Sequence, residues 1–194
     1  MLNLDKITLV VLSGVDYQTI ENLDAIKKSC EKIKWGAVKY IQQGNIIDIS
    51  SWNRAVIYDL HKYIDTDFAM FMHGDAEITH PELWQDSWLQ YDYCGSPWPL
   101  PRDDFSYKTP SGKLIRVGNS VSLRSKKLMK LISARPMEYH YGNNNEDGQI
   151  CVWERDWLEE QGCKFMPFEE ALYFGREHDL PENEGIDTFL VHKI

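Results

Sequence analysis

The chain has 194 residues, 43 % of them hydrophobic, and carries a formal net charge of −9. That length is enough for one sizeable core. Proteins that follow the phosphates of nucleic acid are basic, so the acidic balance disfavours that class and we expect no nucleic-acid partner.

The four cysteines are scattered and form no Cys-x-x-Cys pair. This pattern indicates neither a zinc knuckle nor a disulfide framework, and it fits a reducing, cytoplasmic location. The amino terminus lacks the layout of a signal peptide. No apolar run approaches the ~18 residues of a membrane span.

The first third of the chain alternates between strand and helix patterns. A β-branched run predicts a strand over residues 7–12, and apolar residues at helical spacing predict an amphipathic helix over 20–33. A second strand is expected over 37–41, followed by a helix capped by Ser50 or Ser51. This alternation predicts one α/β domain over residues 1–194, built on a mixed, mainly parallel sheet flanked by helices.

The most informative stretch begins at residue 68. Residues 68–72 form a short, aromatic-rich apolar run that Gly74 stops, as expected for a strand buried on both faces. Asp75 and Glu77 follow at spacing i and i+2, which places both carboxylates on one side of an extended chain. Open α/β sheets bind ligands beyond the carboxyl ends of their strands, and two such carboxylates suit Mg²⁺ or Mn²⁺.

The second half of the chain is less regular. Residues 97–112 hold four prolines and read as a long loop. A strand with Gly118 at its middle is expected over 115–123, then a helix capped by Ser125. A polar turn over 139–145 precedes a helix from 145 to 162, and short strands are expected over 164–168, 171–174 and 189–192.

Four features occur in a fixed order: an acid pair after a central strand, a glycine loop, an acid pair at a helix start and a late histidine. Together they resemble the glycosyltransferases of the GT-A fold. The stretches 91–98, 117–124 and 145–147 are more specifically similar to a family of small GT-A-like domains of bacterial surface-polysaccharide and large-virus proteins. The similarity extends over residues 68–174, and before that only the topology matches.

The resemblance implies a metal-dependent inverting glycosyltransferase of the hexosyl or deoxyhexosyl type. It would move a sugar from a nucleoside-diphosphate sugar to the hydroxyl of a glycan or another acceptor. The family pattern assigns Asp75, Glu77 and His192 to a Mn²⁺ or Mg²⁺ ion and makes Asp147 the general base, kept ionised by its helix amino terminus. The expected substrate-binding residues are Ser13, Arg54, Asp75, Trp98, Gly118, Asn119 and Glu146.

One departure from the family pattern keeps other functions open. Ser120 and Val121 stand where a Gly-Gly pair usually follows the asparagine, and their side chains alter how closely a sugar could approach. A non-catalytic module that binds sugar nucleotides or glycans on the same scaffold is therefore an alternative. A glycoside hydrolase with two carboxylates is a third possibility.

Overall fold

The computed structural model describes residues 1–102, 107–137 and 145–193. Its central sheet has five strands in the order β2-β1-β3-β6-β5. The strand bounds are β1 Leu2–Gly14, β2 Ile33–Gln43, β3 Phe68–Phe71, β5 Tyr93–Pro97 and β6 Val117–Ser125. A smaller sheet has the order β4-β8-β7, with β4 Ala76–Ile78, β7 Gly175–Arg176 and β8 Leu190–His192.

Helices pack around these two sheets. The α-helices are α1 Thr19–Lys32, α2 Ile49–Tyr58, α3 Lys126–Ser133, α4 Glu146–Gly148, α5 Arg155–Glu160 and α6 Phe168–Phe174. A π-helical turn, Gln149–Trp153, joins α4 to α5. Short 3₁₀ helices lie at Leu60–Tyr63, Pro81–Leu83, Asp86–Gln90 and Pro181–Asn183. None of the helices in the described ranges is long and apolar enough to cross a bilayer.

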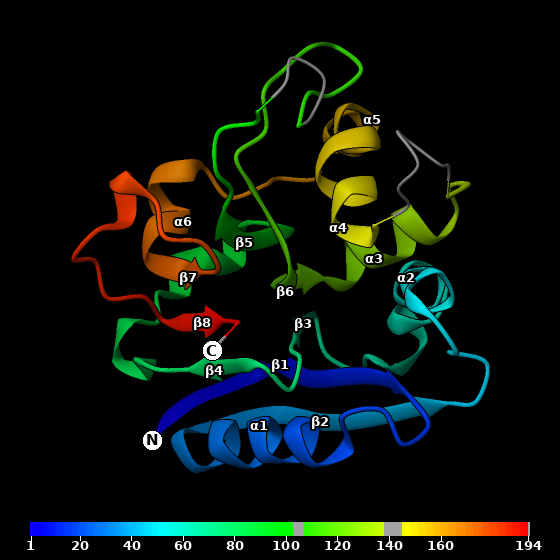
Figure 1. Ribbon diagram of the computed structural model, residues 1–194, viewed down its shortest axis with the longest axis vertical. Coiled ribbons are helices and arrows are strands. Elements are labelled where there is room, and N and C mark those ends of the chain that lie inside the picture. The colour runs from blue at the N-terminus through cyan, green and yellow to red at the C-terminus, as the bar shows by residue number, and fades with distance from the viewer. Residues whose placement is uncertain (103–106, 138–144, 194) are drawn as a thin grey trace.

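The central sheet is mostly parallel, as the sequence predicts, because four of its five strands point in the same direction and only β6 runs opposite. β1 pairs in parallel with both β2 and β3, whereas β6 runs antiparallel to its neighbours β3 and β5. In Figure 1 the small sheet lies to the left of this sheet, α2 and α3 lie to the right, and α1 runs along the lower edge beside β2. Residues 7–14 of β1 are all buried, as expected for a strand covered on both faces.

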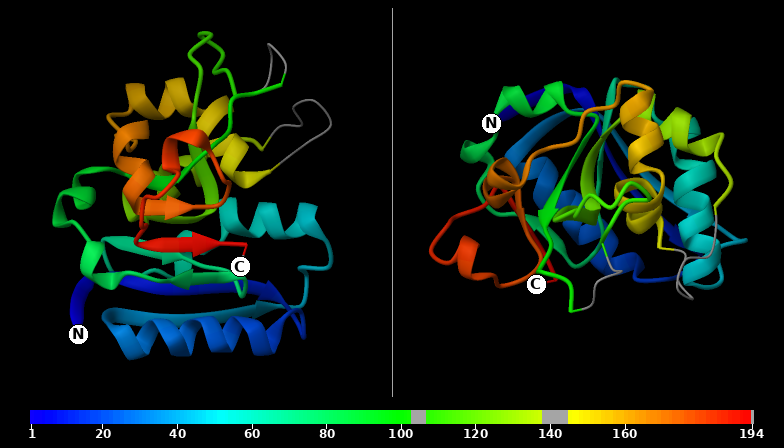
Figure 2. Two further views of the ribbon diagram at one scale, coloured as in Figure 1. Left: turned by 60° about the vertical axis from the view of Figure 1, so that its left-hand side comes forward. Right: turned by 90° about the horizontal axis from the view of Figure 1, so that it is seen from above.

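The small sheet joins distant parts of the chain. β4 follows β3 directly, and it pairs antiparallel with β8, which lies at the other end of the sequence. Figure 2 shows this C-terminal strand, in red, beside the green β4. Phe189 and Leu190 are fully buried, so the last strand is anchored in the core.

Three sequence predictions about helices need correction. Asp48, and not Ser50 or Ser51, caps α2: its carboxylate accepts from the Ser51 backbone N–H at 2.7 Å, and Ser51 completes a capping box. Residues 171–174 lie in α6 and form no strand. The helix expected over 145–162 is interrupted by the π-helical turn.

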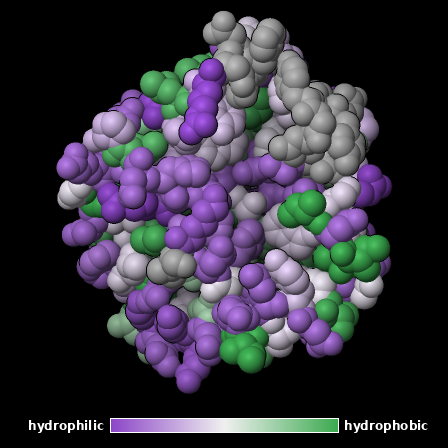
Figure 3. All heavy atoms as spheres, viewed as in Figure 1, coloured by the Kyte–Doolittle hydropathy of each residue, from purple (hydrophilic) through white to green (hydrophobic). Residues whose placement is uncertain are grey.

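The exposed face of α1 also differs from the expectation. Ile20 and Leu23 are 73 % and 47 % exposed, whereas Ala25 and Ser29 are buried and Ile26 and Cys30 pack, partly buried, against the core. Figure 3 shows the exposed apolar side chains as separate green groups, several of them on the right-hand side near α2 and the loop before it. Helical periodicity therefore predicts the helix and the inward side of its second half, but not the exposure of Ile20 and Leu23 in its first half.

Candidate functional site

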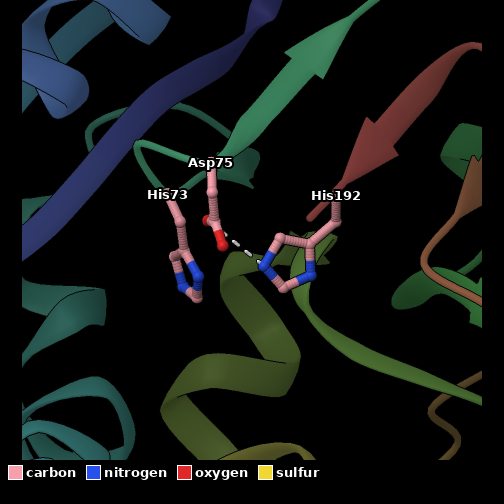
Figure 4. Close-up of side chains that lie close together, drawn as sticks. All are labelled: His73, Asp75 and His192. Atoms are coloured by element: carbon pink, nitrogen blue, oxygen red, sulfur yellow. Dashed lines mark ion pairs between the residues drawn. The ribbon is translucent and has the colours of Figure 1, made fainter. Parts of the chain in front are cut away.

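A cluster of three metal-ligating side chains lies where the two sheets meet. Donor atoms of His73, Asp75 and His192 all lie within 4.8 Å of one another. Figure 4 shows the three side chains converging, with the Nε2 atom of His192 3.4 Å from the Asp75 carboxylate. His73 and Asp75 belong to the turn between β3 and β4, and His192 ends β8. The pairing of Ala76 with His192 brings these two segments together.

The protonation of the cluster suits a metal ion. Burial, with the nearby charges of His192 and Arg124, lowers the pKa of His73 to about 3. Burial also lowers the pKa of His192, although the carboxylates of Asp75 and Glu177 oppose this shift. Both rings are therefore neutral at physiological pH, as metal-ligating imidazoles must be.

Two buried ring nitrogens of the cluster, Nε2 of His73 and Nδ1 of His192, make no hydrogen bond to the residues that the structure describes. A buried polar atom without a partner is costly, and a bound ion would satisfy the Nε2 atom of His73. Two imidazoles and one carboxylate form a donor set typical of Mn²⁺, Fe²⁺ or Zn²⁺, and less so of Mg²⁺.

The structure does not bring Glu77 into this cluster, contrary to the sequence prediction. Its carboxylate instead forms ion pairs with Lys28 at 3.2 Å and Lys32 at 3.0 Å on α1. Hydrogen bonds from these lysines, Lys32 foremost, lower the pKa of Glu77. Residues i and i+2 point to the same side only where the chain is extended. Because β4 begins at Ala76, Asp75 lies in the preceding turn, and its side chain does not share a side with that of Glu77.

A cavity of about 570 Å³ adjoins the cluster at the carboxyl ends of β1 and β2. Ser13 lies in its wall, as expected for a residue at the end of the first strand. His73 also lines the cavity, so one side chain belongs to both features. The other lining residues are Val11, Leu12, Gly14, Val15, Tyr17, Gln18, Asn22, Gly44, Ile46, Ile47, Asp48, Ile49, Trp52 and Ser120.

Trp52 forms the wall between the cavity and the sheet. Its indole N–H donates to the Leu12 carbonyl oxygen at 2.8 Å, which fixes the ring against the end of β1. The ring stacks on Phe71 with centroids 5.8 Å apart and meets His73 edge to face at 5.2 Å. The indole therefore holds one face of His73, on the side of the cavity.

Asp147 has an unusually weak acid group. Although the residue as a whole is half-buried, burial of its carboxyl group is the main cause that raises its pKa to about 7, and the Glu146 carboxylate adds to the shift. The charge of Glu177 acts in the same direction. Burial of the carboxyl group and the Glu146 charge therefore outweigh the expected effect of the helix amino terminus.

Glu146 is not placed to touch a substrate. It is fully buried, and its carboxylate pairs with the Arg124 guanidinium at 3.1 Å. Its backbone N–H donates to the side-chain oxygen of Asn53 on α2. Arg124 also lies over the rings of Phe71 and Tyr93. Glu146 therefore ties α4 to β6 and α2, and thereby fixes the neighbouring Asp147.

Gly118 and Asn119 lie within β6 and not in a loop. A Cβ atom on Gly118 would lie 1.9 Å from the Trp98 ring, so this position requires glycine for packing. Asn119 adopts a left-handed φ of 100°, and its side-chain oxygen accepts from the Val121 backbone N–H at 3.1 Å. β6 bulges here, between the pairs of Gly118 with Ser96 and Leu123 with Cys94.

The bulge also accommodates Ser120 and Val121, which stand where the family pattern usually has two glycines. Val121 is fully buried in the core, and Ser120 lines the cavity. A small hydroxyl side chain is therefore the one that faces the cavity, and the larger valine points away from it.

Two further expected substrate contacts lie elsewhere. Trp98 is only 6 % exposed and stacks on Tyr107 with centroids 4.7 Å apart, so it is a core residue and not a platform for a sugar. Arg54 lies exposed on α2 with its guanidinium over the Tyr58 ring, outside the cavity lining. The spacing of residues along the sequence could not show whether Trp98 and Arg54 line the cavity, because this depends on which side of each element faces it.

Comparison with known proteins supports this fold. Residues 37–192 match the family described as "Protein of unknown function (DUF5672)". The chain belongs to this family. No curated protein matches it. A solved structure, "Crystal structure of a glycosyltransferase involved in the glycosylation of the major capsid of PBCV-1", is similar with a TM-score of 0.60, covering 95 % of this chain and 91 % of that one. The identity is 9 %, so the likeness establishes a glycosyltransferase-like fold.

His73 is the site residue that sequence reasoning missed. It follows β3 by two residues and precedes Asp75 by two, so its position beyond a strand end was a usable signal. The turn at Gly74 packs closely on α1, since a Cβ atom there would lie 3.0 Å from the Asn22 nitrogen. The chain turns here before β4 begins at Ala76, and His73, not Glu77, belongs to the cluster with His192.

Proposed function

We propose that this chain is a metal-dependent glycosyltransferase that moves a hexosyl or deoxyhexosyl group from a nucleoside-diphosphate sugar to an acceptor hydroxyl, with inversion. The observation that carries the proposal is the position of His73, which lies both in the wall of the 570 Å³ cavity and in the cluster with Asp75 and His192. A ligand with an aromatic end and an anionic end, such as a nucleoside diphosphate, fits that pairing of sites.

The residues of the cavity would hold the nucleoside. The ends of β1 and β2 offer backbone groups and Ser13, and Trp52 supplies apolar surface. The diphosphate would then extend past His73 to the cluster. A divalent cation held by His73, Asp75 and His192 would offset the negative charge that develops on the departing diphosphate.

Asp147 is the proposed general base. Its carboxylate would accept the proton of the acceptor hydroxyl as that oxygen attacks the anomeric carbon. A base is most effective when its pKa is near the working pH, and the pKa of Asp147 is raised to about 7. The buried pair of Arg124 and Glu146 keeps the Asp147 segment in place.

The fold and the cysteines of the chain are also consistent with the proposal. The glycosyltransferase-like fold covers nearly the whole chain, so we propose that residues 1–194 act as one catalytic domain. All four cysteines are free, which fits the cytoplasmic location that we propose. The donor would be a nucleoside-diphosphate sugar and the acceptor a glycan or another hydroxyl compound, for example in polysaccharide biosynthesis.

A thermal-shift screen of nucleoside diphosphates and their sugars, with and without Mn²⁺, tests the proposal. We expect one nucleotide to raise the melting temperature only when the metal is present. Release of free nucleoside diphosphate on adding an acceptor would then show transfer, and its absence would favour a non-catalytic binding module. Cleavage of a glycan without any nucleotide would instead indicate a glycoside hydrolase and overturn the proposal.

A further inference from the structure

A second carboxylate lies behind the metal cluster. The Nε2 atom of His192 faces Asp75, while its other ring nitrogen, Nδ1, lies 3.7 Å from the Oε1 atom of Glu177. Figure 4 shows the two nitrogens on opposite edges of the ring, one toward Asp75 and one away from the cluster. The His192 ring is thus held between two carboxylates.

The fold fixes Glu177 in this place. β7 pairs in parallel with β8 through Gly175 with Leu190 and Arg176 with Val191. Continuing that register by one residue sets Glu177 beside His192. The side chains of Glu177 and His192 are 10 % and 7 % exposed, so neither is free to reorient in solvent.

Two groups that carry or can carry a positive charge also lie close to the Glu177 carboxylate. Lys193 holds the same Oε1 atom at 2.6 Å, and the His178 ring lies 3.7 Å from Oε2. Lys193 is itself fixed, because its backbone N–H donates to the Asp75 carbonyl oxygen at 2.9 Å. The carboxylate is therefore anchored independently of His192.

The Nδ1 atom of His192 needs an acceptor. It is buried and makes no hydrogen bond within the part of the chain that is described. Histidines that bind metals donate their second N–H to a carboxylate or carbonyl, which fixes the tautomer and the orientation of the ring. The gap of 3.7 Å exceeds a hydrogen bond by less than 1 Å, so a small shift of the ring would close it.

We propose that Glu177 is a positioning residue for the metal site. It accepts the Nδ1–H of His192, which leaves the Nε2 lone pair directed at the space between Asp75 and His73. This inference rests on the proposed function only in requiring that the cluster binds a divalent metal, and it concerns a residue that touches neither metal nor substrate.

The test is a Mn²⁺ titration of the nucleotide-free protein, followed by electron paramagnetic resonance of the unbound ion. Glu177→Ala should weaken Mn²⁺ binding by about 10–100-fold, because the ring loses its acceptor. Glu177→Gln keeps a carbonyl oxygen at the same reach and should restore most of the affinity. Glu182→Ala is the matched control, since Glu182 pairs with Arg116 at the surface and its loss should leave binding unchanged.

The outcomes separate this inference from the proposed function. Parent protein that does not bind Mn²⁺ overturns the metal site itself. A parent that binds, with Glu177→Ala binding equally well, overturns only the role of Glu177. Equal losses in Glu177→Ala and Glu177→Gln would show that the charge matters and not the hydrogen bond, and would also overturn the positioning role.

Discussion

His73 and His192 meet edge to face, with ring centroids 5.3 Å apart and planes inclined at 80°. One residue follows a strand of the central sheet, and the other ends the small sheet. The contact leaves the buried Nε2 atom of His73 without a partner among the described residues, in a cluster that also contains an exposed carboxylate, Asp75. This candidate metal site therefore depends on both sheets being folded.

The first prediction concerns the ligand set. His73→Phe keeps an aromatic ring against Trp52 and Phe71 but removes the ligating nitrogen, so the protein should fold. Loss of a hydrogen-bond partner behind a metal ligand typically lowers metal affinity by about 10–100-fold. Loss of the ligand itself should lower the Mn²⁺ affinity by at least this much. Isothermal titration of the nucleotide-free protein with Mn²⁺ measures this change.

Glu77→Gln is the matched control for that titration. Glu77 forms ion pairs with Lys28 and Lys32 on α1 and lies outside the cluster, so the Mn²⁺ affinity of this variant should equal that of the parent. If Glu77→Gln lost as much affinity as His73→Phe, the pair Asp75 and Glu77 expected from the sequence would be the ligands after all.

The second prediction concerns packing at the β6 bulge. Gly118→Ala places a methyl group 1.9 Å from the buried Trp98 ring, and overpacking of this kind should lower the free energy of unfolding by about 1–3 kcal/mol. Gly44→Ala is the control, because nothing lies within 4 Å of its added Cβ atom. Urea denaturation of both variants measures the difference, and equal stability would show that Gly118 is not needed for packing.

The sequence predicts the scaffold better than the site. Strands β1 and β3 each contain a short apolar run, residues 7–12 and 68–72, of the kind that a buried strand has. The cap of α3 is a local hydrogen bond, which the Leu128 backbone N–H donates to the Ser125 hydroxyl at 3.0 Å. Such features depend on neighbours in the chain. The late strand expected over 189–192 is also present, as β8.

The residues of the candidate metal site could not be predicted in the same way. Whether Glu77 or His73 faces His192 depends on where β4 begins, and the pairing of Ala76 with His192 decides that. Likewise, Trp98 became a core residue because Gly118 leaves room for its ring. Both facts are long-range contacts, which spacing along one segment does not contain.

The third prediction concerns the pH dependence of transfer. A base must be deprotonated to act, so with the pKa of Asp147 at about 7 the rate should rise about tenfold per pH unit below 7 and level off above it. Asp147→Asn should reduce transfer by about 10²–10⁴-fold and abolish this rise. Rates measured at saturating donor and metal check both, and a variant with nearly parental rates would exclude Asp147 as the base.

The last prediction uses the same residue to test its burial without any substrate. The pKa of Asp147 is raised in the folded state, from 3.8 to about 7. Between these values the folded protein holds a proton that the unfolded chain has released. The contribution of this group to stability is therefore complete below about pH 4 and is lost as the pH rises through 7, by up to about 1.4 kcal/mol per pH unit for one proton.

Asp147→Asn removes that titration and nearly preserves the shape. Relative to the parent, the variant should gain stability as the pH rises from about 4 to about 7, and the gain should level off above pH 7, because asparagine never has to carry a buried charge. Guanidinium denaturation of both proteins at several pH values measures the difference. A difference that does not change with pH would mean that the Asp147 carboxylate is well solvated, and a solvated carboxylate at an ordinary pKa would be a poor base at neutral pH.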